Sequence, residues 1–155
     1  MNVKWKELFV SILISLGVGA LSGYLIKDSM SLFQALEKPP LTPPGWIFPV
    51  VWTILYVLMG ISAYLIYISD SKEKTQALQI YAIQLMLNFI WSLAFFNMQA
   101  YLLAFVILVL LWISIVAMIR KFYKINPIAG KLQVPYLLWV TFAGYLNLAI
   151  YFLNK

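Results

Sequence analysis

The stretch TQALQIYAIQLMLNFIWSLAFFNMQAYLLAFVILVLLWISIVAMI, residues 75–119, contains no Asp, Glu, Lys or Arg. Three further uncharged runs cover residues 8–26, 39–69 and 132–154, and all eleven basic and all five acidic residues lie outside the four runs. A helix needs about 20 apolar residues to cross the hydrocarbon core of a bilayer. The 75–119 stretch is long enough for two such helices, separated at the polar residues 97–99. The sequence therefore predicts an all-α integral membrane bundle of five transmembrane helices.

These runs place the expected helices at about 8–26, 46–69, 77–97, 101–119 and 132–153, within a single domain over residues 1–155. Residues 27–44 form the longest connection between helices. It contains Pro39, Pro40, Pro43 and Pro44, which cannot continue a helix and predict a stiff, extended entry to the second span. On the first helix, Gly19 and Gly23 have the spacing that permits close approach of another helix.

The distribution of basic residues predicts the orientation in the membrane. The N-terminus, the 70–74 turn and the 120–131 loop share one side and carry eight of the eleven Lys and Arg residues. The 27–44 loop, the 97–100 break and the C-terminus share the other side and carry three. Loops rich in Lys and Arg remain cytoplasmic. We expect a multi-pass cell-membrane protein with a cytoplasmic N-terminus, and with the C-terminus and the 27–44 loop outside.

The composition argues against several functional classes. With 64% hydrophobic residues the chain is unsuited to water, and its +6 charge lies at the span ends, so no nucleic acid partner is expected. Cys and His are both absent, which removes thiolate nucleophiles and the commonest general base and metal ligand. No metal site and no covalently bound cofactor are expected. No span contains an ionisable Asp, Glu, Lys or Arg, which argues against a carboxylate-coupled ion pump.

Polar and aromatic residues recur at helical spacing on three of the predicted spans. The three stripes are Trp52, Tyr56, Gly60 and Ala63; Gln84, Asn88, Trp91 and Phe95; and Trp139, Ala143, Leu146 and Asn147. An amide is costly in hydrocarbon unless it is hydrogen-bonded, so the amides should face the bundle interior, either joining helices or contacting a ligand. The three Trp residues either form ordinary packing or line an aromatic pocket for a flat apolar molecule.

Several longer motifs resemble one membrane protein family. They are KPPLTPPGW at 38–46, PVVWTILY at 49–56, QLMLN at 84–88 and PYLLW at 135–139. Together they resemble the translocator protein family, also called the peripheral benzodiazepine receptor or tryptophan-rich sensory protein family, in its bacterial branch. The resemblance implies a five-helix bundle, usually a homodimer. It also implies a pocket under the first loop for tetrapyrroles such as protoporphyrin IX or haem, for sterols, and for drug-like isoquinoline or benzodiazepine-type ligands.

The resemblance assigns roles to particular positions of this chain. Trp52 and Trp139 resemble the pair associated with porphyrin binding and light-dependent porphyrin breakdown. Asn88, Trp91, Ala143 and Leu146 resemble pocket-lining residues, and the stripes add Tyr56 and Asn147 to the predicted ligand-binding set. The chain departs from the family pattern where members often carry Trp-Tyr, Trp and Asp; here these positions are Leu32-Phe33, Leu41 and Phe105. The first two departures reduce the expected stacking of the loop on a porphyrin.

Two functions from different classes follow, beside a purely structural role. The first is a membrane receptor or transporter that binds tetrapyrroles. The alternative is an enzyme that degrades protoporphyrin under light and oxygen. Its chemistry would come from the excited porphyrin, with Trp52 and Trp139 as electron donors or radical quenchers.

Overall fold

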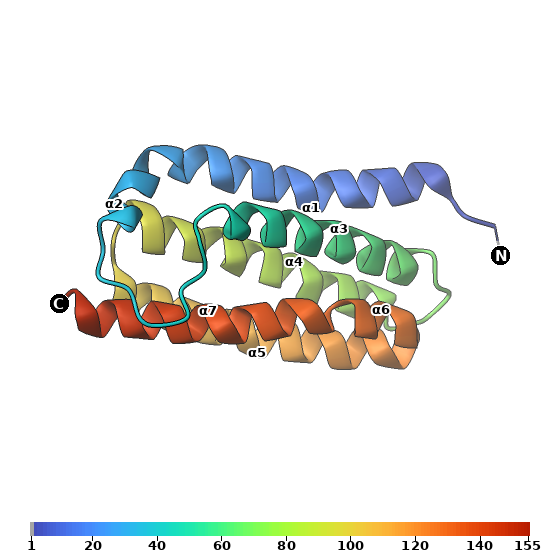
Figure 1. Cartoon of the computed structure of the whole chain (residues 1–155). Coiled ribbons are helices and arrows are strands. Elements are labelled where there is room, and N and C mark those ends of the chain that lie inside the picture. The colour runs from blue at the N-terminus through green and yellow to red at the C-terminus, as the bar shows by residue number, and fades with distance from the viewer. Residues whose placement is uncertain (1) are drawn as a thin grey trace.

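Helices of membrane-spanning length dominate the structure, a computed structural model that describes residues 2–155 (Figure 1). The elements in chain order are α1 (Trp5–Ile26), the 3-10 turn η1 (Lys27–Ser29), α2 (Met30–Gln34), α3 (Ile47–Tyr67), α4 (Lys74–Ser92), the π-helical turn η2 (Leu93–Asn97), α5 (Tyr101–Ile125), α6 (Pro127–Leu132) and α7 (Val134–Leu153). Five stretches of helix are long and apolar enough to cross a membrane. The predicted all-α bundle of five transmembrane helices is confirmed.

The helices extend beyond several of the predicted ends. Residues 27–34 are helical, so the prediction of a loop over all of 27–44 is wrong for this part. Likewise α5 continues to Ile125 rather than ending at residue 119. In both places the sequence boundary was set at a charged residue, and a charge ends a membrane span without ending a helix. A separate helix, α6, precedes α7, because Asn126 caps it by accepting from the backbone N–H groups of Ile128 and Ala129.

The two ends of the bundle differ in what they contain. The N-terminus and the α3–α4 turn lie at one end, and the C-terminus, α2, residues 35–46 and the α4–α5 turn lie at the other, which we call the loop end (Figure 1). Helix α1 lies along one edge of the bundle beside α3, while α5 and α7 lie at the opposite edge (Figure 1). Only Ser15 and Ser22 of α1 are buried, so α1 is the most peripheral of the five long helices.

Helix α1 is held close to α3 by small residues. The Ser15 hydroxyl donates to the backbone carbonyl of Tyr56 at 2.6 Å. A Cβ added at Gly60 would lie 2.5 Å from the Cα of Ile12, and one added at Gly19 would lie 2.5 Å from the ring of Tyr56. Close approach of this kind is the usual role of small residues between membrane helices. The predicted close packing around Gly19 therefore occurs, and it occurs within one chain.

The α1–α3 contact predicts a specific sensitivity at Gly60. Gly60→Ala would place a methyl group against the backbone of Ile12 and should reduce the free energy of unfolding by about 1–3 kcal/mol, measured by denaturant titration in detergent. Gly17→Ala is the matched control, since a Cβ there meets no atom within 4 Å. The control should be neutral or slightly stabilising because Ala favours helix over Gly by about 1 kcal/mol. Equal unfolding curves for the two variants would contradict the close contact between α1 and α3 at Gly60.

Candidate ligand pocket

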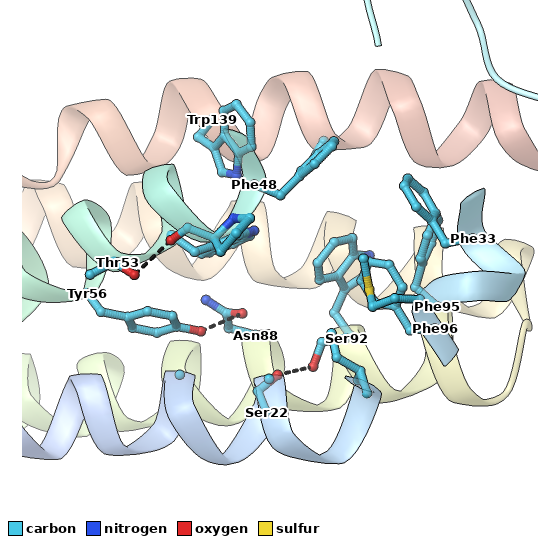
Figure 2. Close-up of a pocket in the computed structure, with 18 of the residues that line it drawn as sticks. Ser22, Phe33, Phe48, Thr53, Tyr56, Asn88, Ser92, Phe95, Phe96 and Trp139 are labelled. Atoms are coloured by element: carbon cyan, nitrogen blue, oxygen red, sulfur yellow. Dashed lines mark hydrogen bonds between the residues drawn. The ribbon is translucent and has the colours of Figure 1, made fainter. Parts of the chain in front are cut away.

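A cavity of about 480 Å³ lies in the loop-end half of the bundle, between α1, α3, α4 with η2, and α7 (Figure 2). Small-molecule sites in proteins commonly occupy about 300–1,000 Å³ and have mainly apolar walls. All eight residues predicted to contact a ligand line this cavity: Trp52, Tyr56, Asn88, Trp91, Trp139, Ala143, Leu146 and Asn147. Residues from the three stripes, which lie on three different helices, therefore line the same cavity.

The three predicted Trp side chains form a contiguous aromatic wall. The ring centroid of Trp52 lies 6.3 Å from that of Trp91 and 6.5 Å from that of Trp139. The Phe48 ring stands edge-on to Trp139 at 5.8 Å (Figure 2). Aromatic rings at such separations attract one another through edge-to-face and offset contacts. The cluster is rigid and offers flat apolar surfaces to a bound molecule.

A second group of rings was not assigned to the site from the sequence. Phe33, Phe48 and Phe96 line the cavity beside Phe95, which the sequence placed only on a stripe (Figure 2). Phe95 and Phe96 are consecutive and both face the cavity, since the π-helical turn η2 changes the rotation between residues. Phe33, on α2, is buried and packs 5.4 Å from Phe96. Phe33 and Phe96 have no periodic signal, because the sequence predicts a loop at α2 and η2 departs from α-helical spacing. Phe48 lies four residues before Trp52 on the same helical face, so its spacing was an available signal.

Helix α1 supplies the remaining wall, which the sequence analysis also missed. Leu16, Gly19, Ala20 and Gly23 line the cavity. The apolar residues of α1 surround the helix almost evenly, so hydrophobicity gives no inward face. Its small residues do mark that face, and they were the available signal.

The buried amides form hydrogen bonds between helices. The Tyr56 hydroxyl donates to Asn88 Oδ1 at 3.3 Å, Asn88 Nδ2 donates to the Tyr136 hydroxyl at 2.9 Å, and that hydroxyl donates to Gln84 Oε1 at 2.7 Å. This polar network joins α3, α4 and α7 below the cavity. Of the two readings of the amides, interhelical bonding is therefore observed, and Asn88 in addition contributes to the cavity wall.

Asn147 plays a comparable role nearer the loop end. Its Oδ1 accepts the indole N–H of Trp91 at 2.9 Å, and its Nδ2 donates to the backbone carbonyl of Tyr101 at 2.8 Å. The ring plane of Trp91 is thereby fixed by α7. Asn147 consequently acts as both an interhelical bond and a pocket residue.

Among the cavity-lining residues, one buried side-chain polar atom has no partner within the described part of the chain. The indole Nε1 of Trp139 is buried and forms no hydrogen bond with any residue in 2–155. A buried donor without an acceptor typically costs about 1–3 kcal/mol.

The 35–46 connection is bound to α7 at the loop end (Figure 1). Asn154 Nδ2 donates to the Glu37 carbonyl at 2.8 Å, and the Glu37 N–H donates to Asn154 Oδ1 at 3.0 Å. The Tyr145 hydroxyl donates to the Pro40 carbonyl at 2.9 Å. These three bonds hold the connection across the end of the bundle.

The polar network predicts that Tyr136 stabilises the site as a whole. Tyr136→Phe would leave Asn88 Nδ2 and Gln84 Oε1 without this partner, and should cost about 1–3 kcal/mol of unfolding free energy. Tyr123→Phe is the control, since its side chain is half exposed. Denaturant titration of both variants measures the difference in unfolding free energy. If Tyr136→Phe were as stable as the control, the hydrogen-bond network would not contribute to stability.

Comparison with known proteins agrees with this architecture. The TspO/MBR family matches residues 11–153. The tryptophan-rich protein TspO of Chlorobaculum tepidum is 42% identical over 99% of both chains, and the tryptophan-rich sensory protein of Cereibacter sphaeroides is 36% identical over 99% of this chain and 95% of its own. The human translocator protein is 32% identical over 88% of this chain and 83% of its own. A match over nearly the whole chain, on a five-span bundle, shows that this protein belongs to the TspO/MBR family.

Proposed function

We propose that this protein is a membrane receptor or transporter that binds tetrapyrroles, such as protoporphyrin IX or haem, in the cavity between α1, α3, α4 and α7. The observation that carries the proposal is the meeting of Trp52, Trp91 and Trp139 around a mainly apolar space of about 480 Å³. Other flat ligands, including drug-like isoquinoline and benzodiazepine types, would use the same surfaces. The words "sensory" and "translocator" in the relatives' names are compatible with a binding role.

The chemistry of the walls indicates how such a ligand would be held. Indole and phenyl faces supply the stacking surface. Because the chain contains neither His nor Cys, haem would be held through its ring faces and edge rather than through those axial ligands. We therefore propose the tetrapyrrole as a reversible ligand rather than a resident cofactor.

Ala143 should control the space available to the ligand. It is buried on the cavity wall, one helical turn from both Trp139 and Asn147. Ala143→Phe would fill part of the cavity, and overfilling a packed site costs about 1–3 kcal/mol. We expect a roughly tenfold to hundredfold weaker affinity for protoporphyrin IX, measured by quenching of tryptophan fluorescence in a titration.

Ala149→Phe is the matched control, because Ala149 lies on the same helix and does not line the cavity. It should bind protoporphyrin IX nearly as the parent does. If Ala143→Phe bound protoporphyrin IX as tightly as the parent, the tetrapyrrole would bind outside this cavity, and the proposed binding site would be wrong.

The alternative function, light- and oxygen-dependent breakdown of protoporphyrin, rests on the proximity of Trp52 and Trp139, whose ring centroids are 6.5 Å apart. Two indoles this close could exchange an electron with an excited porphyrin bound beside them. Phe keeps most of the stacking surface and is far harder to oxidise. If the enzyme hypothesis is right, Trp52→Phe and Trp139→Phe should still bind the porphyrin, but its absorbance should no longer decrease under light. If binding and light-dependent breakdown decreased to the same extent, the result would support the binding function and not the enzyme.

We further propose that the N-terminus is cytoplasmic and that the C-terminus and the loop end lie outside the cell membrane, from the eight-to-three split of Lys and Arg. The Cys-free chain suits single-cysteine labelling. Lys155→Cys should react with an impermeant maleimide added to whole cells, while Lys72→Cys should react only after permeabilisation. The reverse pattern would invert the orientation.

The family resemblance also suggests a homodimer. The face of α1 that carries Gly19 is already used against α3, so we expect the dimer contact on another lipid-facing surface of the bundle.

A further inference from the structure

The cavity has exposed residues on one flank only. Of its lining residues, those that are exposed are Ala20 and Gly23 on α1 and Pro49 and Thr53 on α3. The lining residues of α2, α4, η2 and α7 are buried or half-buried. The cavity therefore reaches the surface of the bundle between α1 and α3.

The α1–α3 seam ends between two glycines one helical turn apart. A Cβ added at Gly19 would lie 2.5 Å from the Tyr56 ring, whereas a Cβ added at Gly23 meets no atom within 4 Å. Both glycines line the cavity. Helices α1 and α3 are thus in close contact at Gly19 and separated at Gly23, so the gap between them is confined to the part nearer the loop end.

The loop end itself is closed above the cavity. Phe33 packs between Phe48 and Phe96, at 6.0 and 5.4 Å between ring centroids. The Ser29 hydroxyl donates to Asn97 Oδ1 at 2.6 Å, which connects η1 to the end of η2. With residues 35–46 bonded to α7 as well, the end of the bundle offers a ligand less room than the flank.

We propose that the gap between α1 and α3, bounded by Ala20, Gly23, Pro49 and Thr53, is a portal through which ligand exchanges directly with the hydrocarbon of the bilayer. The proposal rests on the proposed binding function and defines its ligand class. The gap lies within two membrane-spanning helices, so a molecule must first dissolve in the bilayer to reach it. Flat, mainly apolar ring systems satisfy that condition, and strongly hydrated molecules do not.

The test is the rate of ligand exchange in vesicles of phosphatidylcholine that contain the protein. Protoporphyrin IX is equilibrated with the vesicles, and stopped-flow quenching of tryptophan fluorescence gives its association and dissociation rates. Gly23→Leu would fill the open space at the portal and should slow both rates by about tenfold. Gly17→Leu is the control: it also has open space around it, is exposed, and does not line the cavity, so its rates should match those of the parent.

Two further variants distinguish the routes. Thr53→Phe obstructs the portal from the α3 side and should slow exchange as Gly23→Leu does. Tyr145→Phe removes the bond to Pro40 and loosens the 35–46 connection, and it should leave the rates unchanged if ligand enters through the flank.

The possible results separate the portal from the binding function. Unchanged association in both Gly23→Leu and Thr53→Phe would overturn the portal, and faster exchange in Tyr145→Phe would assign entry to the loop end instead. Weaker affinity without slower association would make Gly23 a ligand contact rather than part of an entrance. Absence of saturable quenching in the parent would overturn the proposed function itself.

Discussion

The hydrogen bond from the Tyr56 hydroxyl to Asn88 lies where the principal contacts of the bundle meet. The backbone carbonyl of Tyr56 accepts from Ser15, and its ring fills the space left by Gly19, so the residue anchors α1. Its hydroxyl begins the polar network that continues to α4 and α7, and its ring packs 5.8 Å from Trp52. In hydrocarbon, polar groups must find partners inside the protein. Satisfying that constraint at Tyr56 also fixes the floor of the cavity.

The bundle consequently divides into two parts with different packing. In the half of the bundle that contains the N-terminus, side chains such as Ile66, Met118 and Phe122 are fully buried between the helices. In the loop-end half, rigid aromatic rings meet at edges and angles, and rings cannot adapt their shape as aliphatic chains do. The polar network lies between these halves, and its members Tyr56 and Asn88 also form part of the cavity wall.

The sequence predicts the number of spans well, because charge is excluded from hydrocarbon and its absence marks each span directly. Helix ends are predicted less well, since α5 continues through Arg120 and Lys121 after its apolar stretch has ended. Spacing separates Trp52, Trp91 and Trp139, which converge, from Trp5 and Trp46, which are exposed at helix starts. The inward face of α1 carries Ser11, Ser15 and Ser22 at helical spacing, but the apolar residues that surround the helix obscure this signal. The contribution of Phe33 is not predicted because it depends on how the chain turns after its first span.

The departures from the family pattern acquire a physical meaning in this arrangement. Leu41, one of these departures, is 81% exposed and adopts a positive φ of 73°, and none of residues 34–47 lines the cavity. A smaller side chain at position 41 therefore leaves the pocket walls intact. At the departure Leu32-Phe33, the Phe33 side chain still provides a ring that packs on Phe48 and Phe96. Aromatic lining is thus supplied by the helices, while the connection contributes bonds to α7 and closes the end. Affinity for a flat ligand should accordingly follow the residues on the helices, and the connection should govern the stability of the loop end.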